Sequence, residues 1–241
     1  MIYILVDHDN LKKNRYQEYR RGLVDIVEVV CERFMQLSGV EIDRIMVRLY
    51  GGWFAGNNIT RPAQEIVRAI SVSFPRTFSY VRNEVAHKYI VNVEMAYTLL
   101  INQREQIYNT YRTRNTNIDF RFKHPISIGC HDSECPLIGV SDIINHRRCN
   151  HGKCLLTLEN IIERDEQKLV DTMIGADTIF LLQNNGNNYV CIVSSDDDFM
   201  PFYMHACAIN RDIYHIDTNN MRSQRSCYAR LLNAHYHNIV M

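Results

Sequence analysis

The run Ile2-Tyr3-Ile4-Leu5-Val6-Asp7 and its counterpart Tyr189-Val190-Cys191-Ile192-Val193 decide the fold of this chain. Both runs are almost continuously apolar, which is typical of strands that are covered on both faces in a parallel sheet. Asp7 closes the first run, and the triplet Asp196-Asp197-Asp198 follows the second after Ser194-Ser195. The carboxyl ends of parallel strands meet at one edge of a sheet. We therefore predict two central, neighbouring strands that carry their acids to the same edge.

Strand and helix patterns alternate along the rest of the chain. The patterns predict helices over Gly22–Leu37, Pro62–Ser73, Asp165–Gly175, Phe199–Ile209 and Ser226–Ala234, and further strands over Ile45–Tyr50, Tyr89–Met95 and, last, Ile213–Ile216. Residues 102–120 are polar and predict a long exposed loop or a frayed helix. The fold class expected is therefore α/β, a three-layer sandwich with a mostly parallel central sheet.

Length and composition fit one globular domain with an insertion. The 241 residues are 46% hydrophobic and 22% charged, with only 10 Gly and 5 Pro, which excludes fibrous and disordered chains. No apolar run is long enough to span a membrane, and Asp7 interrupts the first run before it could form a signal-peptide core. We expect a cytoplasmic protein with no membrane partner.

Carboxylates crowded at one edge of a sheet repel one another, and a bound cation relieves that repulsion. Asp7, Asp9 and the triplet Asp196-Asp197-Asp198 form such a group in the predicted sheet. Oxygen ligands of this kind select Mg²⁺ or Mn²⁺ rather than Zn²⁺. The alternative is that these acids cap helices, with Asp198 as the cap of Phe199–Ile209.

Three separated motifs extend this acidic pattern along the whole chain. They are Ile4-Leu5-Val6-Asp7-x-x-Asn10-Leu11, then Lys168-x-x-Asp171 with Asp177 six residues further on, and then Val193-Ser194-Ser195-Asp196-Asp197-Asp198-Phe199-x-Pro201. In this order the motifs resemble those of the NYN-domain nucleases of the PIN-like superfamily. Ser195 and Asp197 depart from the pattern, because the family usually has Gly and often has Ser at these positions.

This resemblance implies a metal-dependent nuclease that hydrolyses phosphodiester bonds and leaves a 5′-phosphate and a 3′-hydroxyl. RNA is the expected partner, with single-stranded DNA as the second. Carried over by position, the catalytic Mg²⁺ or Mn²⁺ ligands are Asp7, Asp171, Asp196 and Asp198, supported by Asn10 and Ser194. Asp177 ranks lower, because six residues turn a helix by about 600° and leave it about 120° from Asp171 unless Gly175 ends the helix.

A second constellation lies in the middle of the chain. Cys130-x4-Cys135 and Cys149-x4-Cys154 are two like-spaced pairs, which predict a structural Zn²⁺ site held by four thiolates. His131 or His151 could replace one thiol, and buried thiols without metal are the alternative. We expect a zinc-binding insertion over residues 124–160, between two parts of the PIN-like domain at 1–123 and 161–241.

Basic residues that could contact phosphates follow the first strand and lie within the expected zinc segment. They are Lys12, Lys13, Arg15, Arg147 and Arg148. Each group is equally compatible with an ordinary solvated surface.

Two other functions remain open. Leu5-Val6-Asp7-His8-Asp9 resembles the strand-Asp-x-Asp signature of haloacid-dehalogenase phosphatases, with Asp7 as nucleophile and Asp9 as general acid. The second alternative is a non-catalytic RNA-binding module. The sequence also leaves homo-oligomer formation open.

Overall fold

The computed structural model describes residues 1–8, 10–11, 22–82, 84–114, 134, 136–149, 154–161, 164–184, 188–218 and 229–240. The chain divides into two compact units. The first consists of Met1–Tyr111 and Gln167–Met241, and the second of Arg112–Glu166. The expected insertion boundaries at residues 124 and 160 fall within the second unit.

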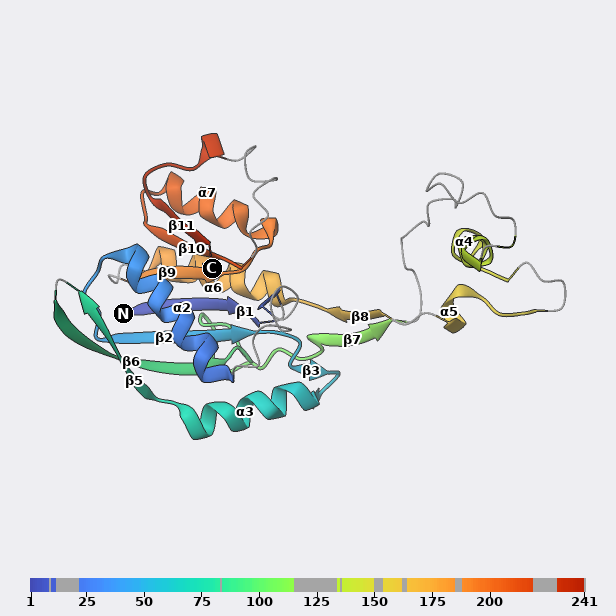
Figure 1. Cartoon of the computed structure of the whole chain (residues 1–241), viewed down its shortest axis with the longest axis horizontal. Coiled ribbons are helices and arrows are strands. Elements are labelled where there is room, and N and C mark those ends of the chain that lie inside the picture. Colours follow the sequence, from blue (N-terminus) through green and yellow to red (C-terminus); the bar gives the residue numbers. More distant parts are fainter. Residues whose placement is uncertain are drawn as a thin grey trace. The chain divides into compact units, whose positions relative to one another are not determined.

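A seven-stranded sheet forms the centre of the first unit, in the order β11-β10-β9-β1-β2-β6-β5 (Figure 1). Its strands are β1 (Ile2–Asp7), β2 (Arg44–Tyr50), β5 (Arg76–Arg82), β6 (Val85–Met95), β9 (Tyr189–Val193), β10 (Ile213–Asp217) and β11 (Tyr236–Val240). β1 pairs in parallel with both β9 and β2, whereas β5 runs antiparallel to β6. The prediction that the two apolar runs are central neighbours is confirmed.

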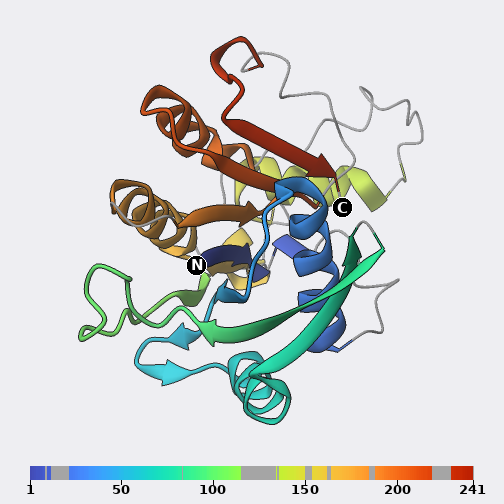
Figure 2. The ribbon, with the colours of Figure 1, turned by 90° about the vertical axis from the view of Figure 1, so that its left-hand side faces the viewer.

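Helices flank the sheet on both faces. They are α2 (Leu23–Ser38), α3 (Arg61–Ser73), α6 (Val170–Gln183) and α7 (Met200–Ala208). Figure 2 shows α6 and α7 on one side of the sheet and α2 on the other. Alternate side chains of a strand feed the two cores: Ile4 packs in the cluster of α2, and Leu5 packs in the cluster of α6 and α7. The α/β class with a mostly parallel sheet is confirmed, and the layering is compatible with a three-layer sandwich.

The predicted helix Asp165–Gly175 is wrong at both ends. A short strand, β8 (Arg164–Gln167), precedes α6, and α6 continues for eight residues beyond Gly175 to Gln183. Gly175 lies inside the helix because α7 packs closely against it: a Cβ there would be 2.1 Å from Cζ of Phe202. The glycine permits a close helix contact and does not end the helix.

The end of the chain also differs from the prediction. In place of the closing helix Ser226–Ala234, the described residues form a 3-10 turn, η4 (Ala229–Leu231), followed by β11. β11 pairs in parallel with β10, so the strand at Ile213–Ile216 is not the last one. Tyr236–Val240 mixes polar and apolar residues, as expected for a strand at a sheet edge, and therefore lacks the apolar run that identifies β1 and β9.

The remaining elements are short. A two-residue pair, β3 (Phe54–Ala55) and β4 (Asn58–Ile59), follows β2, and β7 (Tyr111–Arg114) lies within the segment predicted as a loop or frayed helix. β7 and β8 are neighbours in a smaller sheet, and each strand crosses the boundary between the two units. The second unit contains α4 (Pro136–His146) and α5 (Leu158–Ile161). None of the helices that the structure describes combines the length and the apolar character needed to cross a membrane.

Gly175→Ala tests the contact between α6 and α7. Alanine has the higher helix propensity by about 1 kcal/mol, yet we expect the variant to lose about 1–3 kcal/mol of unfolding free energy, because Phe202 must move. Gly139→Ala in α4 is the control, since nothing lies within 4 Å of its added Cβ. It should be neutral or stabilising in the same denaturant titration. A Gly175→Ala variant as stable as the parent would contradict the close packing.

Candidate functional site

Asp7 lies at the carboxyl end of β1 and is only 5% exposed. Its Oδ1 accepts a hydrogen bond from the Asn10 backbone N–H at 3.2 Å, and its Oδ2 accepts one from the Ser194 hydroxyl at 3.2 Å. A buried carboxylate needs such donors, because leaving it unsatisfied costs several kcal/mol. The structure thus brings together three of the residues predicted for the site.

Thr218, which directly follows β10, joins this group. The side-chain oxygen of Asn10 accepts hydrogen bonds from the Ser195 hydroxyl at 2.7 Å and from the Thr218 hydroxyl at 3.1 Å. Thr218 and Asp217 are both buried and stand at the carboxyl end of β10, beside β9. Sequence reasoning missed these two residues, although an apolar strand that ends directly in Asp217 was the signal that could have found them.

His215 fixes the position of the Ser194 backbone. Its Nε2 lies 2.8 Å from the Ser194 carbonyl oxygen and its Nδ1 lies 2.7 Å from the Tyr236 hydroxyl. A carbonyl oxygen only accepts, so Nε2 carries a proton and donates it. The Tyr203 ring stacks on this imidazole with 4.7 Å between ring centroids. A contiguous set of contacts therefore runs from β11 through β10 to Ser194.

Asp196 is the acid of the triplet that caps a turn. Its Oδ1 accepts from the Asp198 backbone N–H at 3.0 Å at the start of the 3-10 turn η2 (Asp197–Phe199). The capping alternative made Asp198 the cap of the helix Phe199–Ile209, but α7 has Phe199 at its N-cap position and no side-chain cap there; the acid that caps is Asp196, and the element that it caps is η2. The Asp196 backbone N–H also donates to the Ser194 hydroxyl at 3.1 Å, which ties the triplet to the Asp7 group.

Asp171 and Asp177 lie on one helix but in different surroundings. Asp171 is exposed in the first turn of α6, a helix that packs against β1, β9 and η2. Asp177 is fully buried in the middle of the same helix, because Gly175 does not end it. The two residues therefore do not share one position at the edge of the sheet.

Asp177 belongs to a buried ion-pair network under α6. Its Oδ2 accepts from the Tyr50 hydroxyl at 2.6 Å and lies 3.2 Å from Nε of Arg48, while its Oδ1 accepts from the Leu100 N–H at 2.7 Å. Arg48 also contacts the Glu94 carboxylate and the Thr98 carbonyl.

Burial raises the pKa of Asp177, and the hydrogen bonds from Tyr50 and Leu100 and the charge of Arg48 oppose that rise. Burial also raises the pKa of Tyr50, which stays a hydrogen-bond donor. The geometry of Asp177 is that of a structural residue.

The side chains at the carboxyl edge are of the type that binds a hard cation, but few of them are carboxylates. Asp7, Asp196, Asn10 and Ser194 offer only oxygen and amide groups, the chemistry that Mg²⁺ and Mn²⁺ prefer. Among the residues that the structure describes, no three His, Cys, Asp or Glu side chains are placed to hold a metal ion together. Mg²⁺ commonly uses one or two carboxylates and completes its shell with water and substrate phosphate.

Several predicted residues lie outside the described ranges. They are Asp9, Lys12, Lys13, Arg15, Cys130, His131, Cys135 and His151. Cys149 and Cys154, of the second unit, are partly buried thiols, and the Cys149 N–H donates to the Leu156 carbonyl at 2.9 Å. Arg147 is partly exposed and Arg148 exposed in the same segment. The four-thiolate zinc site therefore stays a prediction.

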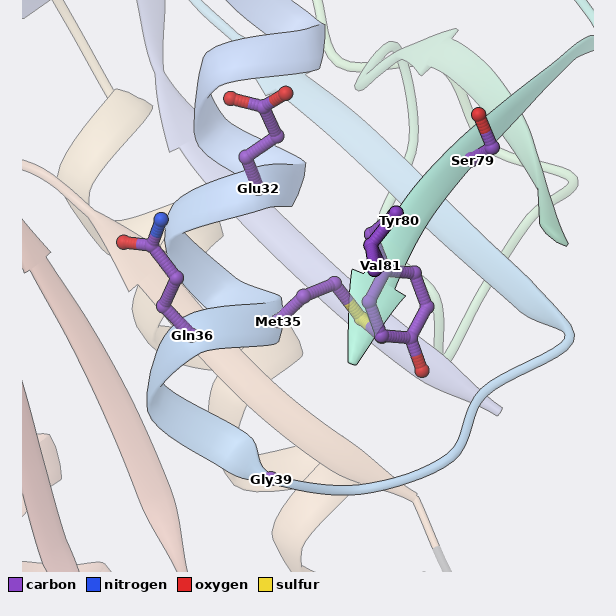
Figure 3. Close-up of a pocket in the computed structure, with 7 residues that line it drawn as sticks. All are labelled: Glu32, Met35, Gln36, Gly39, Ser79, Tyr80 and Val81. Atoms are coloured by element: carbon purple, nitrogen blue, oxygen red, sulfur yellow. The ribbon is translucent and has the colours of Figure 1, made fainter. Parts of the chain in front are cut away.

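A pocket of about 540 Å³ lies away from this edge, between α2 and β5 (Figure 3). Met35 of α2 points toward Tyr80 of β5, and Glu32, Gln36, Gly39, Ser79 and Val81 complete the lining. Of the residues described in the structure, none predicted for the site lines this pocket. We therefore place the candidate site at the carboxyl ends of β1, β9 and β10.

Asp177→Asn and Asp171→Asn make the same change at two places on α6. Asp177→Asn leaves Arg48 buried beside a neutral amide, so we expect a loss of about 3–5 kcal/mol of unfolding free energy. Asp171→Asn removes an exposed charge from a helix N-terminus and should cost under about 1 kcal/mol. Chemical denaturation of both variants measures the difference. Equal stabilities would contradict the structural assignment of Asp177.

No protein-family model, curated protein or solved structure matches this chain. A function for the carboxyl edge therefore has to come from its side chains, their burial and their hydrogen bonds, together with the three sequence motifs.

Proposed function

We propose that this protein is a metal-dependent nuclease that hydrolyses phosphodiester bonds, most often of RNA, at the carboxyl edge of its sheet. The observation that carries the proposal is the buried Asp7, held by Ser194 and Asn10 and joined to Asp196 through the same Ser194 hydroxyl. A carboxylate fixed in this way at the end of a central parallel strand lies where α/β folds bind ligands. The three motifs that resemble those of NYN-domain nucleases supply the reaction class.

The roles of the side chains follow from these contacts. A divalent ion held by Asp7 and Asp196 would supply a deprotonated water and neutralise charge on the phosphate. Ser194 and the Asn10 N–H keep both oxygens of Asp7 in one orientation, so that little reorganisation is needed when a cation binds. Asp198 and Asp171 are exposed and complete the acidic set in this proposal.

The finer features of the chain belong to the same proposal. The first unit is taken as a PIN-like domain and the second as an insertion stabilised by zinc on Cys130, Cys135, Cys149 and Cys154. A structural zinc would hold together a segment too small for a large core of its own. Thiols available for metal fit a reducing compartment such as the cytoplasm.

One specific observation favours a second candidate, a non-catalytic RNA-binding module. Asp196 caps η2 with its carboxylate, and a capping role alone would explain why an acid stands there. Binding of RNA without metal-dependent cleavage would select this alternative. Release of phosphate from small monoesters would instead favour a phosphatase with Asp7 as nucleophile.

The decisive measurement is cleavage of mixed single-stranded RNA with Mn²⁺, with Mg²⁺ and with EDTA. We expect cleavage only with a metal ion. Asp7→Asn and Asp196→Asn should each reduce it by about 10²-fold or more, because each removes a carboxylate while keeping the shape of the side chain. Asn also caps helices well, so Asp196→Asn should change stability by under about 1 kcal/mol.

The matched control is Asp43→Asn. Asp43 is exposed and directly precedes β2, at the opposite edge of the sheet from Asp7. The Asp43→Asn variant should cleave RNA as fast as the parent protein does. Cleavage that continues in EDTA, or an Asp196→Asn variant as active as Asp43→Asn, would remove this site from the proposal.

Elemental analysis of protein purified without chelators tests the zinc site. We expect about one zinc per chain, lost in a Cys149→Ser/Cys154→Ser variant, because a tetrahedral site needs four ligands. Cys207→Ser serves as the control, since that thiol is buried in α7 of the first unit and should not affect the metal content. Absence of zinc from the parent protein would exclude the site.

A further inference from the structure

A separate pocket of about 360 Å³ opens at the end of β2. Its walls include Trp53, Thr60, Arg61, Tyr111 and Gln167, all of which belong to the first unit. None of these residues belongs to the three motifs of the proposed nuclease site. The volume is within the usual range for pockets that hold small molecules or single groups of a larger ligand.

This pocket adjoins the carboxyl edge where Asp7 lies. Tyr50, the last residue of β2, pairs in register with Asp7 of β1. Trp53 follows three residues later. The centroid of its ring lies 5.5 Å from the centroid of the His8 ring, and His8 is the neighbour of Asp7 in sequence. A chain of nucleotides that reaches Asp7 would therefore pass close to the pocket.

Two glycines allow the aromatic walls to pack closely against the backbone. A Cβ at Gly52 would be 2.9 Å from Cδ2 of Tyr111, and a Cβ at Gly51 would be 2.7 Å from Cη2 of Trp53. The Trp53 indole N–H also donates to the Leu49 carbonyl at 3.2 Å. Both rings are thus held in place before any ligand binds, which lowers the entropy cost of stacking a flat group against them.

The polar groups of the pocket offer both charge and hydrogen bonds. Arg61 is 90% exposed at the start of α3, and its ion pair with Glu65, at 3.5 Å, is exposed too. Such surface pairs contribute little, so the guanidinium can turn to a phosphate at small cost. Gln167 is partly exposed and carries an amide that can both donate and accept.

We propose that this pocket binds one nucleotide of the substrate strand, with the base stacked on Tyr111, its edge facing the Gln167 amide and its phosphate paired with Arg61. An aromatic wall, an amide and an arginine are the groups with which proteins recognise unpaired bases and their backbone. A pocket of this size takes a single unstacked base, so the substrate class is single-stranded nucleic acid. This inference depends on the proposed function for the identity of the ligand.

The chain has one tryptophan, so the fluorescence of Trp53 reports directly on this pocket. The protein is titrated with AMP, GMP, CMP and UMP without added Mg²⁺ or Mn²⁺ and without a chelator, so that any structural zinc stays bound. Ribose 5-phosphate and inorganic phosphate serve as ligands without a base. We expect a saturable change in emission with at least one nucleotide, and at least about 10-fold weaker binding of ribose 5-phosphate, because it lacks the stacking contact.

Variants assign the contacts. Tyr111→Ala should weaken nucleotide binding by about 10-fold or more, Tyr111→Phe should retain it, and Arg61→Gln should weaken it while leaving the fold intact, since Arg61 is exposed. Tyr80→Ala, in the pocket of Figure 3, is the matched control and should bind like the parent. Circular dichroism confirms that each variant is folded.

The outcomes separate this inference from the nuclease proposal. No saturable change with any nucleotide, equal binding of ribose 5-phosphate, or a folded Tyr111→Ala variant that binds like the parent would overturn the pocket assignment, even if the protein cleaves RNA. Nucleotide binding that depends on Tyr111, in a protein that never cleaves nucleic acid, would support the pocket and reject the nuclease.

Discussion

The parallel pairing of β1 with β9 on one side and β2 on the other is the constraint on which the rest of the first unit depends. It buries β1 on both faces, so its side chains must supply two cores at once. It also sets the register that places Asp7 beside the end of β2 and next to Ser194. Any slip by one residue would exchange the two cores and turn Asp7 to the other face.

Two buried polar sites in this unit have different roles. At the first, Arg48 and Tyr50 of β2 bind Asp177 of α6, and a network of this kind favours one packing arrangement of the helix on the sheet. Asp7 is buried as well, and among its partners are a backbone N–H and a hydroxyl at the carboxyl end of the sheet. Asp177, by contrast, lies beside the Arg48 guanidinium in the middle of α6.

The sequence was informative where one physical demand dominated. Continuous apolar runs identified β1 and β9 because only strands covered on both faces need them, and the acids that follow located the edge. Gly175 misled because a glycine can serve either a helix end or a close contact, and Phe202, which decides between them, is distant in sequence. β11 and Thr218 were missed for a related reason. β11 owes its place to pairing with β10, and Thr218 owes its role to a hydrogen bond with Asn10. Neither contact can be read from the local sequence pattern.

Ser195 shows why a departure from a motif need not weaken a site. Glycine is required where the backbone takes a positive φ, and Ser195 is not among the described residues that do. Its hydroxyl, which glycine would lack, donates to the side-chain oxygen of Asn10 together with that of Thr218. Two donors on this oxygen fix the direction of the Asn10 amide. The hydroxyl of Ser195 therefore adds order to the group of polar residues around Asp7, which a glycine at this position could not do.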